Sequence, residues 1–504
     1  MDTSPLRRCP ALLTMAAAML LVAPGAMAAT PSALPHGASS ILDATDGHHS
    51  PGGTGHQVDH FKHQLAKSGY VSQEGSEAVF DLNRRYCEGA LFSGLWPNPQ
   101  SPYIVTNMPE VPGQAPNTNP PVTWRLRQDE AVVLIGTTPP PEEYFSFDLT
   151  NVKGSLHTGP VVWTSVGDPV NNKTVKTTGR ESYSRPFALV ITGNARTRDE
   201  VNHMLDASGL GGETNDMTIP PAMYKLGLDQ DADQFLLGTR TIVAKPGFEK
   251  ALDDYRATPP VQVFRVRPHS DSGDETNPVY PADPLPVPPL RVSGTGATEL
   301  DLNPTLQTLR QRIIDAHPGF DVHDEVVERG VEESNPGLQA NLITNPPTAG
   351  VDGLSNDADD PITNEFSLPD GSFAVAYGAN HVATGQASYS SVTVNADTHA
   401  AVAVTAENNV DLQGSARDFI DDQPDADKLY AWSFTRAGDS GPSGPHVTTL
   451  PPVSTNFCAQ YGGDRPVDLS AIRIGARAYM QPETLTRPAF SSLLMDRVLV
   501  FTPK

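Results

Sequence analysis

Polar side chains that could do chemistry follow two similar apolar segments of the chain. The first segment ends at Gly136 and the second ends at Gly378. The loops after them carry Thr137, Thr138, Glu142 and Tyr144 in one case, and Asn380, His381, Thr384, Ser388 and Tyr389 in the other. His381 is the one histidine in these loops, and an imidazole can act as acid, base or ligand near neutral pH.

A carboxylate also follows an apolar segment, because Asp168 comes directly after the predicted strand 161–166. Such a carboxylate can orient a histidine or act as a second acid. We therefore expect His381, Asp168 and Tyr144 to be catalytic, and we expect substrate to be bound by Asn172, Asn380, Thr384 and Tyr389. The competing interpretation is that these are turn and capping residues, since their side chains bond readily to the local backbone.

The two loops would share one cleft if the units that carry them were copies of each other. Six pairs of segments follow in the same order in 122–268 and 369–503: 129–136 with 370–378, 144–147 with 388–391, 188–192 with 401–405, 197–200 with 415–418, 235–242 with 429–434, and 261–268 with 497–503. The fourth pair has a hydroxyl residue followed three positions later by an acid, which predicts a helix start. The shared order predicts an internal duplication, although two unrelated domains with common strand and cap chemistry would also fit.

The fold class expected from these units is α+β. Each unit is predicted to be a mainly antiparallel sheet with a helix packed on one face. Two similar units of this kind often pack about a pseudo-twofold axis, and ligand sites favour such interfaces. We expect unit 1 over 122–268 and unit 2 over 369–504, joined by a Pro-rich, acidic linker, 269–368, that contains a helix over 304–317 with Asn303 as its cap and Pro304 in its first turn.

The N-terminal part has a different organisation. Residues 1–28 have the pattern of a secretory signal, with Arg7 and Arg8 before an apolar core and Ala26-Met27-Ala28 as the cleavage site. Residues 29–55 form a His-, Pro- and Gly-rich leader that we expect to be disordered. The segment 56–121 is predicted to hold a helix with Val58, Phe61 and Leu65 on one face, a second helix over 76–86, and an extended stretch from 97.

Composition narrows the classes of protein that fit. The chain has 504 residues, a formal net charge of −24, 41 glycines and 48 prolines. Such a charge repels nucleic acid, and no basic patch offsets it. After removal of the signal, we expect no membrane span, so the protein is predicted to be periplasmic or extracellular. Its cofactor and oligomeric state are not indicated by the sequence.

Two cysteines, Cys87 and Cys458, remain after removal of the signal. In an oxidising compartment they can pair and link the N-terminal region to the C-terminal one. We favour this bridge over two separate buried thiols, although the spacing alone does not show that the two Cα atoms lie within reach.

Two other sets of residues suggest metal binding. The histidines at 48, 49, 56, 60 and 63 are close in sequence, and three of them, His56, His60 and His63, share one face of the predicted helix. Imidazoles at that spacing can bind Zn²⁺, Cu²⁺ or Ni²⁺. Asp229, Asp231 and Asp233 have the alternation of a calcium loop but lack its glycine and its final glutamate. For this second set we favour a solvated acidic turn over a calcium site, and we assign no metal ligands.

The segment Gly438-Asp439-Ser440-Gly441-Pro442 resembles the serine segment of chymotrypsin-like proteases over five residues. Those enzymes also need a histidine base and a buried aspartate well upstream. The sequence offers no such pair in the family's context, so we assign no nucleophile here.

Two functions therefore remain from the sequence, and whether the protein is an enzyme stays open. The first is a secreted, hydrolase-type enzyme that acts on a small-molecule or polymer substrate between the two units. The second is a non-catalytic secreted protein that binds a ligand or a surface. A concave pocket around His381 would favour the first, whereas the absence of such a constellation would favour the second.

Overall fold

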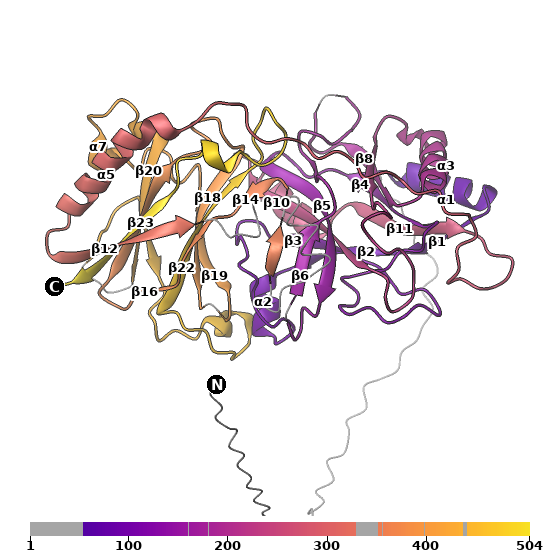
Figure 1. Ribbon diagram of the computed structural model, residues 1–504, viewed down its shortest axis with the longest axis horizontal. Helices are drawn as coiled ribbons and strands as arrows, with labels where there is room; N and C mark the ends of the chain where they lie inside the picture. The colour runs from indigo at the N-terminus through magenta and orange to yellow at the C-terminus, as the bar shows by residue number, and fades with distance from the viewer. Residues whose placement is uncertain are drawn as a thin grey trace, which may run out of the picture. The chain divides into compact units, whose positions relative to one another are not determined.

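The computed structural model describes residues 54–159, 161–179, 181–328, 351–354, 356–397, 399–436 and 441–504. The predicted signal, most of the leader and residues 438–440 of the Ser440 segment lie outside these residues. The described chain is a mixed α+β fold, as expected (Figure 1). Its helices are α1 Gly55–Lys67, α2 Leu82–Cys87, α3 Ala195–Leu205, α4 Glu249–Ala257, α5 Asn303–Asp315 and α7 Arg417–Ile420, with the short turns η1 Asp206–Leu210, η2 Leu300–Leu302, η4 Ala426–Lys428, η5 Phe457–Tyr461 and η6 Phe490–Ser492.

Two sheets are formed mainly by the first half of the chain. The five-stranded sheet has the order β1 Tyr70–Glu74, β11 Val261–Pro268, β4 Ala131–Thr137, β8 Pro186–Thr192 and β9 Thr214–Thr218. The other sheet has the order β13 Val351–Leu354, β6 Val161–Ser165, β5 Glu142–Gly154, β10 Gln234–Ala244, β3 Tyr103–Asn107 and β2 Ser76–Phe80, with β7 Val170–Asn171 beside β5. Strand β3 lies inside the stretch that the sequence predicted only to be extended.

The third sheet belongs to the second half. Its order is β19 Val402–Asn408, β18 Tyr389–Ala396, β22 Ala471–Tyr479, β15 Ile362–Thr363, β12 Phe320–Glu328, β23 Arg497–Pro503, β17 Phe373–Ala379, β20 Leu429–Arg436 and β21 Val447–Leu450, with β14 Ala358–Asp359 and β16 Phe366–Ser367 beside β22. Among the described strands, the pairs β8–β9, β6–β13 and β20–β21 are parallel, and the other pairs are antiparallel.

The strand pairings of the two halves correspond. In the first half β4 pairs antiparallel with β8 and β11, and β5 pairs antiparallel with β6 and β10. In the second half β17 pairs with β20 and β23, and β18 pairs with β19 and β22, again antiparallel. Each set also has a parallel edge strand, β9 beside β8 and β21 beside β20. An antiparallel neighbour lies on the outer side of the last strand, β1 beside β11 and β12 beside β23.

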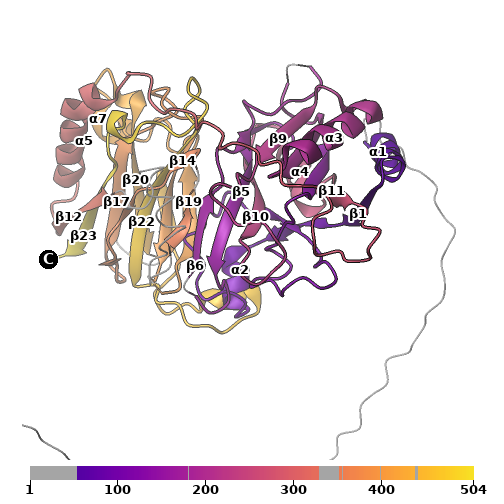
Figure 2. The ribbon, with the colours of Figure 1, turned by 45° about the vertical axis from the view of Figure 1, so that its right-hand side comes forward.

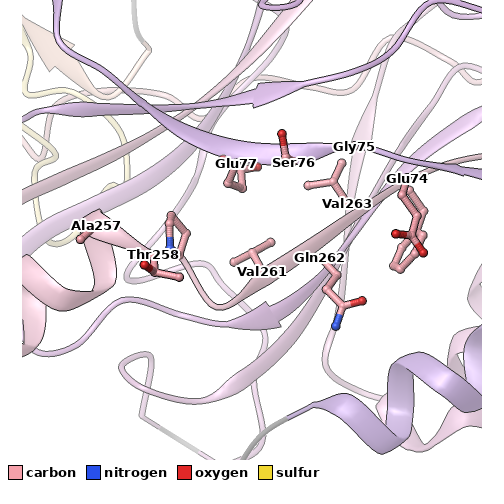
Figure 3. Close-up of a pocket in the computed structure, with 11 residues that line it drawn as sticks. Glu74, Gly75, Ser76, Glu77, Ala257, Thr258, Val261, Gln262 and Val263 are labelled. Atoms are coloured by element: carbon pink, nitrogen blue, oxygen red, sulfur yellow. The ribbon is translucent and has the colours of Figure 1, made fainter. Parts of the chain in front are cut away.

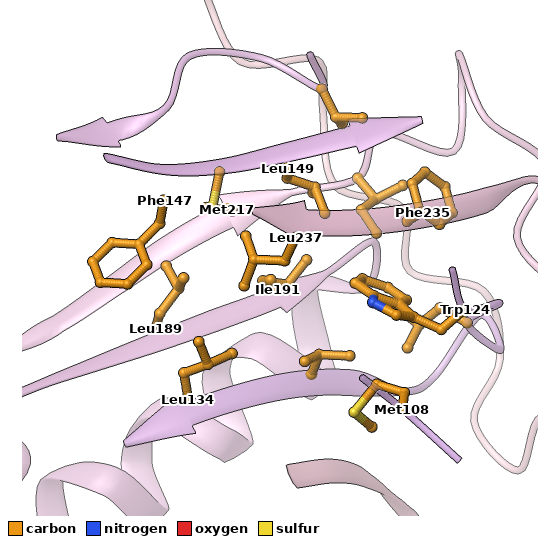
Figure 4. Close-up of a cluster of buried hydrophobic side chains, with 14 of the residues drawn as sticks. Met108, Trp124, Leu134, Phe147, Leu149, Leu189, Ile191, Met217, Phe235 and Leu237 are labelled. Carbon is orange, nitrogen blue, oxygen red and sulfur yellow. The ribbon is translucent and has the colours of Figure 1, made fainter. Parts of the chain in front are cut away.

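Alternation along the strands explains the layers of the first half. Side chains of one parity from β4, β8 and β9 meet those of β5 and β10 in an apolar core that includes Leu134, Leu189 and Phe147 (Figure 4). Side chains of the other parity on β4 and β8 pack against α1 and α3. The second half repeats the arrangement, because β17, β20 and β23 face β18 and β22 on one side and α5 and α7 on the other (Figure 2).

Helical periodicity correctly predicted the buried face of α1, where Val58, Phe61 and Leu65 are all nearly inaccessible. Helix α5 matches the helix predicted over 304–317, with Pro304 in its first turn, but Asn303 is already helical and does not cap it. The predicted hydroxyl cap at Thr197 is wrong, because Asn194 caps α3 by accepting from the backbone N–H of Thr197.

The helix predicted over 76–86 is also wrong in its first part. Residues 76–80 form strand β2, which pairs with β3, and only Leu82–Cys87 is helical, with Asp81 as its cap. Gly75 makes the change of sheet possible between β1 and β2. A side chain at Gly75 would lie 2.6 Å from the carbonyl oxygen of Asn107 and 2.6 Å from Sδ of Met108. The chain therefore needs glycine at this close approach.

A disulfide joins Cys87 of α2 to Cys458 of η5, with a Cα–Cα distance of 5.2 Å. The pairing expected from the two cysteines is therefore present. Nearby, the Asn83 amide donates to the carbonyl of Ala403 at 2.8 Å and accepts from its N–H at 3.1 Å. These contacts attach α2 to strand β19 of the second half. No helix among the described residues has the length and apolar character needed to cross a membrane.

Candidate functional site

Tyr144 lies on β5 at the junction between the two halves. Its hydroxyl donates to Oδ2 of Asp357 at 2.9 Å, and the side-chain amide of Asn171 donates to the same oxygen at 2.6 Å. All three side chains are fully buried. Burial raises the pKa of Asp357 to about 7, and the hydrogen bonds from Asn171 and Tyr144 oppose that rise only in part.

Tyr389 lies on β18, and both it and Tyr144 pack against Tyr479. The ring of Tyr479 lies between them, with ring centres 5.3 Å from Tyr144 and 5.4 Å from Tyr389. The Tyr389 hydroxyl donates to the Gln100 side chain at 3.0 Å, and the amide of Asn98 donates to it at 3.0 Å. All three rings are buried. They pack against one another, with hydrogen bonds at the hydroxyls of Tyr144 and Tyr389, and leave no opening beside the two tyrosines.

Asp168 lies in a different environment from the one predicted for it. Its Oδ2 accepts the backbone N–H of Arg291 at 2.6 Å and lies 3.2 Å from the Arg291 guanidinium. The neighbouring Asn172 donates to the hydroxyl of Tyr183 at 2.8 Å. These contacts hold surrounding loops in place and involve no other predicted catalytic residue.

His381 follows β17 and is buried between two carboxylates. Its Nδ1 lies 2.9 Å and 3.0 Å from the two oxygens of Glu299, and its Nε2 lies 3.5 Å from Oδ2 of Asp496. Burial alone would lower the pKa of His381, but the two carboxylates outweigh that effect and raise it well above the ordinary value. Burial would likewise raise the pKa of Glu299, but His381 lowers it. The pair is therefore an imidazolium held by carboxylates, with both ring nitrogens engaged.

The remaining residues predicted near His381 support this ion group. Thr384 donates its hydroxyl to Glu299, and Asn380 donates its side-chain amide to the carbonyl of Asn409 at 2.9 Å. The cavity that His381 and Asp496 line has a volume of only about 10 Å³. That space holds one water molecule at most. The side-chain contacts of His381 include neither Asp168 nor Tyr144, contrary to the prediction. The cavity beside it is too small for a substrate.

A larger cavity, of about 270 Å³, lies in the first half beside β11 (Figure 3). One wall is the chain from Glu74 to Glu77, where β1 ends and β2 begins, and the other is β11 from Val261 to Phe264. Residues 257–259 close one end. The cavity exists because β1 pairs with β11 only as far as Glu74 opposite Phe264, with one further bond from the Gly75 N–H to the Val263 carbonyl at 2.9 Å. Beyond Gly75 the chain turns away to join β3.

Glu77 is the residue of this cavity with perturbed acidity. Its Oε1 accepts the hydroxyl of Thr106 at 2.5 Å, whereas its Oε2 is buried and has no hydrogen-bond partner among the described residues. Burial raises the pKa of Glu77 to about 7, and the bond from Thr106 offsets only part of that rise. At the cavity's far end, the carboxylate of Glu74 pairs with Lys62 at 2.6 Å. Among the described lining residues there are two acids and no base.

In the acidic turn at 229–233, which was weighed as a calcium loop, a lysine side chain pairs with the carboxylates. Nζ of Lys225 lies 3.2 Å from Asp229 and 3.8 Å from Asp231, in an exposed turn. Among the described residues, no group of three or more histidine, cysteine, aspartate or glutamate side chains is arranged to hold a metal ion. The turn is therefore a solvated acidic turn with a local ion pair.

Sequence reasoning missed Glu299 and Glu77. Glu299 lies in a Pro- and Gly-rich loop, so no local pattern marked it. Asp357 was noted only as one of a group of acids that could bind calcium, together with Asp359 and Asp360. Glu77 was assigned to a helix. The run Ser76–Phe80 after Gly75 is short and does not alternate, so no clear sequence signal marked it as a strand.

Comparison with known proteins identifies no family for this chain. No protein-family description matches it, and no curated protein matches it significantly. The VPA0106 protein from Vibrio parahaemolyticus is structurally similar at a TM-score of 0.35 and 10% identity, over 88% of this chain and 95% of that one. A structure of broad bean stain virus aligns at a TM-score of 0.12 and 9% identity, over 74% and 76% of the two chains. Truncated AlyQ, with CBM32 and alginate lyase domains, aligns at 0.14 and 8%, over 86% and 100%. Such scores are too low to support an argument about fold or function.

Proposed function

We propose that this is an exported, non-catalytic binding protein that takes an extended polypeptide segment into the cavity beside β11. The observation that carries the proposal is the free edge of that strand. Strand β11 has β4 along one side, but opposite Val261–Val263 its other side faces the cavity of about 270 Å³. Free strand edges are templates for another extended chain.

We also propose that the chain arose by duplication, with β1, β4, β5, β6, β8, β9, β10 and β11 equivalent to β12, β17, β18, β19, β20, β21, β22 and β23. The corresponding pairings of the two halves support this proposal. The equivalence differs from the sequence matches in three places. It relates β8 to β20 and β10 to β22, and it does not relate 197–200 to 415–418, because α3 follows β8 whereas α7 precedes β20. The matches of 129–136, 144–147 and 261–268 with their partners remain the same.

The proposed duplication explains why the cavity lies beside β11. In the second half, β12 pairs with β23 up to Arg497, the first residue of that strand. In the first half, β1 stops at Phe264, three residues short of the first residue of β11. The cavity therefore occupies the place where the other half has a paired strand. A bound segment would supply the missing backbone partners.

The backbone groups of β11 and the charge of the cavity lining indicate which kind of segment would bind. The Gly75 N–H donates to the Val263 carbonyl, so the backbone groups of Val263, and by alternation those of Val261, lie on the cavity side of β11. The Val261 N–H already donates to the Pro259 carbonyl at 2.8 Å, which leaves the Val263 N–H and the Val261 carbonyl to pair with a bound segment. An extended segment can therefore pair with these two groups.

Lys62 already pairs with Glu74, and the raised pKa of Glu77 leaves that carboxyl partly neutral near pH 7. The lining nevertheless holds no base, and the protein has a net charge of −24, so a basic segment is favoured over an acidic one.

Export is supported by the disulfide between Cys87 and Cys458, because such bonds persist in oxidising compartments. The hydrolase considered from the sequence has less support. Both nitrogens of His381 face carboxylates, and among the described residues no serine, threonine or cysteine side chain bonds to its ring. A base of that kind needs a free nitrogen beside a nucleophile or a water.

The test is binding of a fluorescent pentapeptide of alternating valine and lysine, followed by anisotropy. We expect saturable binding, loss of binding when the central peptide nitrogens are methylated, and weaker binding when glutamate replaces lysine. Ser76→Trp should block the cavity, since Ser76 is an exposed residue of its wall. Ser72→Trp is the matched control, because Ser72 is exposed on β1 and does not line the cavity. Equal binding by the methylated peptide, or by S76W, would contradict the proposal.

A further inference from the structure

The face of α1 that points away from the sheet carries three histidines. Val58, Phe61 and Leu65 bury the opposite face, and the Phe61 ring contacts that of Phe264 with centres 6.1 Å apart. At 3.6 residues per turn, positions 56, 60 and 63 fall within an arc of roughly 60°. His56 and His63 are exposed and His60 is partly exposed, so ions in solution can reach all three rings.

The rings already lie in near-parallel pairs. The ring centres of His56 and His60 are 6.3 Å apart with an angle of 18° between planes, and those of His60 and His63 are 6.5 Å apart at 19°. Two imidazoles on one zinc ion, at the usual 2.0–2.1 Å from nitrogen to metal, have centres roughly 5–6 Å apart. A small rotation of the side chains is therefore enough for two nitrogens to share an ion.

No hydrogen bond or ion pair engages these three rings within the described part of the chain. Their nitrogens are free to coordinate, unlike those of His381. The net charge of −24 also raises the concentration of cations near the surface. The net charge of the protein, the accessibility of the three rings and the distances between them all favour binding of a cation that prefers imidazole ligands.

We propose that His56 and His60 chelate one divalent transition-metal ion of the Zn²⁺, Ni²⁺ or Cu²⁺ class, with water in the remaining positions. Histidines four residues apart on one helix face are the spacing that helical zinc motifs use. The other pair is less suitable, because Lys67 lies one turn beyond His63 and its charge repels a second cation. No third histidine, cysteine or carboxylate completes a three-ligand group among the described residues, so the site has two protein ligands and open positions.

The experiment is calorimetric titration of tag-free protein with ZnCl₂ and NiCl₂. In every protein tested, His36, His48 and His49 are replaced by glutamine, so that leader histidines do not contribute. We expect one ion per chain, and at least about a hundredfold weaker affinity in both H56Q and H60Q, since a chelate loses one arm. The variant H63Q and the control H203Q, at an exposed histidine of α3, should stay within about threefold of the parent.

Three results would overturn the assignment. Absence of saturable binding would remove the site, and unchanged affinity in H60Q would place the ion elsewhere. Equal loss of ion affinity in H56Q and H63Q would show that His56 and His60 are not the chelating pair. The side chains replaced on α1 and α3 are exposed or, at His60, partly exposed. Circular dichroism verifies that α1 remains folded in each variant. Loss of ion affinity with unchanged helicity then reports coordination alone.

Discussion

Replacing Asp357 with asparagine is expected to remove a pH-dependent part of the stability. Asp357 is fully buried at the junction of the halves, where Tyr144 and Asn171 donate to it. Burial raises its pKa to about 7 from an ordinary value of 3.8. The folded protein therefore binds this proton more tightly than the unfolded chain does.

The sign and the magnitude follow from linkage. Below about pH 4 both states are protonated, and the full contribution of the raised pKa to stability is present. As the pH rises from 4 to 7, the unfolded chain loses the proton first, so the free energy of unfolding falls. A difference of roughly three pKa units, at 1.36 kcal/mol per unit, corresponds to about 4 kcal/mol. Asparagine does not titrate, so the variant D357N lacks this decline.

The assay is urea unfolding of both proteins between pH 4 and pH 8, followed by tryptophan fluorescence. Relative to the wild type, D357N should gain about 4 kcal/mol across this range, whatever its offset at pH 4. Asp271→Asn is the matched control, because the side chain of Asp271 is fully exposed. Its profile should parallel that of the wild type. Parallel profiles for D357N and the wild type, within about 1 kcal/mol, would refute the buried-charge reasoning.

Three further changes test the packing. The double variant C87S/C458S should lose about 3–5 kcal/mol in urea unfolding, because the bridge closes a separation of 371 residues; unchanged midpoints on reduction of the wild type would argue against this. His381→Asn should lower the free energy of unfolding by about 3–5 kcal/mol below pH 6, since it leaves a buried carboxylate unpaired. This loss should shrink as the pH rises through the raised pKa of His381, and a loss that does not depend on pH would contradict the ion pair. Gly75→Ala should lower stability by about 1–3 kcal/mol, because its Cβ would lie 2.6 Å from two atoms. Gly55→Ala, with nothing within 4 Å of its Cβ, should stay within about 0.5 kcal/mol; equal effects of the two would refute the crowding argument.

The candidate site was predictable only in part. Tyr144 and Tyr389 were expected at a shared junction, and the structure places both against Tyr479. His381 was expected to be catalytic, whereas the structure pairs it with Glu299 and Asp496, which the sequence did not indicate. They lie 82 positions before it and 115 positions after it, and no local pattern links residues at such separations.

Local periodicity accounts for what the sequence by itself determined. The apolar stripe Val58, Phe61 and Leu65, the helix that contains Pro304, and the mixed α+β class all depend on side chains a few residues apart, whose spacing directly reflects helix or strand geometry. The two cysteines could be named as partners because only two lie outside the predicted signal segment.

Tertiary structure alone decided the rest. Whether Ser76–Phe80 is helix or strand depends on β3, which supplies its backbone partners, and a five-residue run does not contain that information. The open edge of β11 depends on where β1 leaves it, at Gly75, and the close approach of Asn107 and Met108 sets that point. Burial, which raises the pKa values of Asp357 and Glu77, is likewise a property of the packed chain, because it depends on neighbours that folding brings from distant positions.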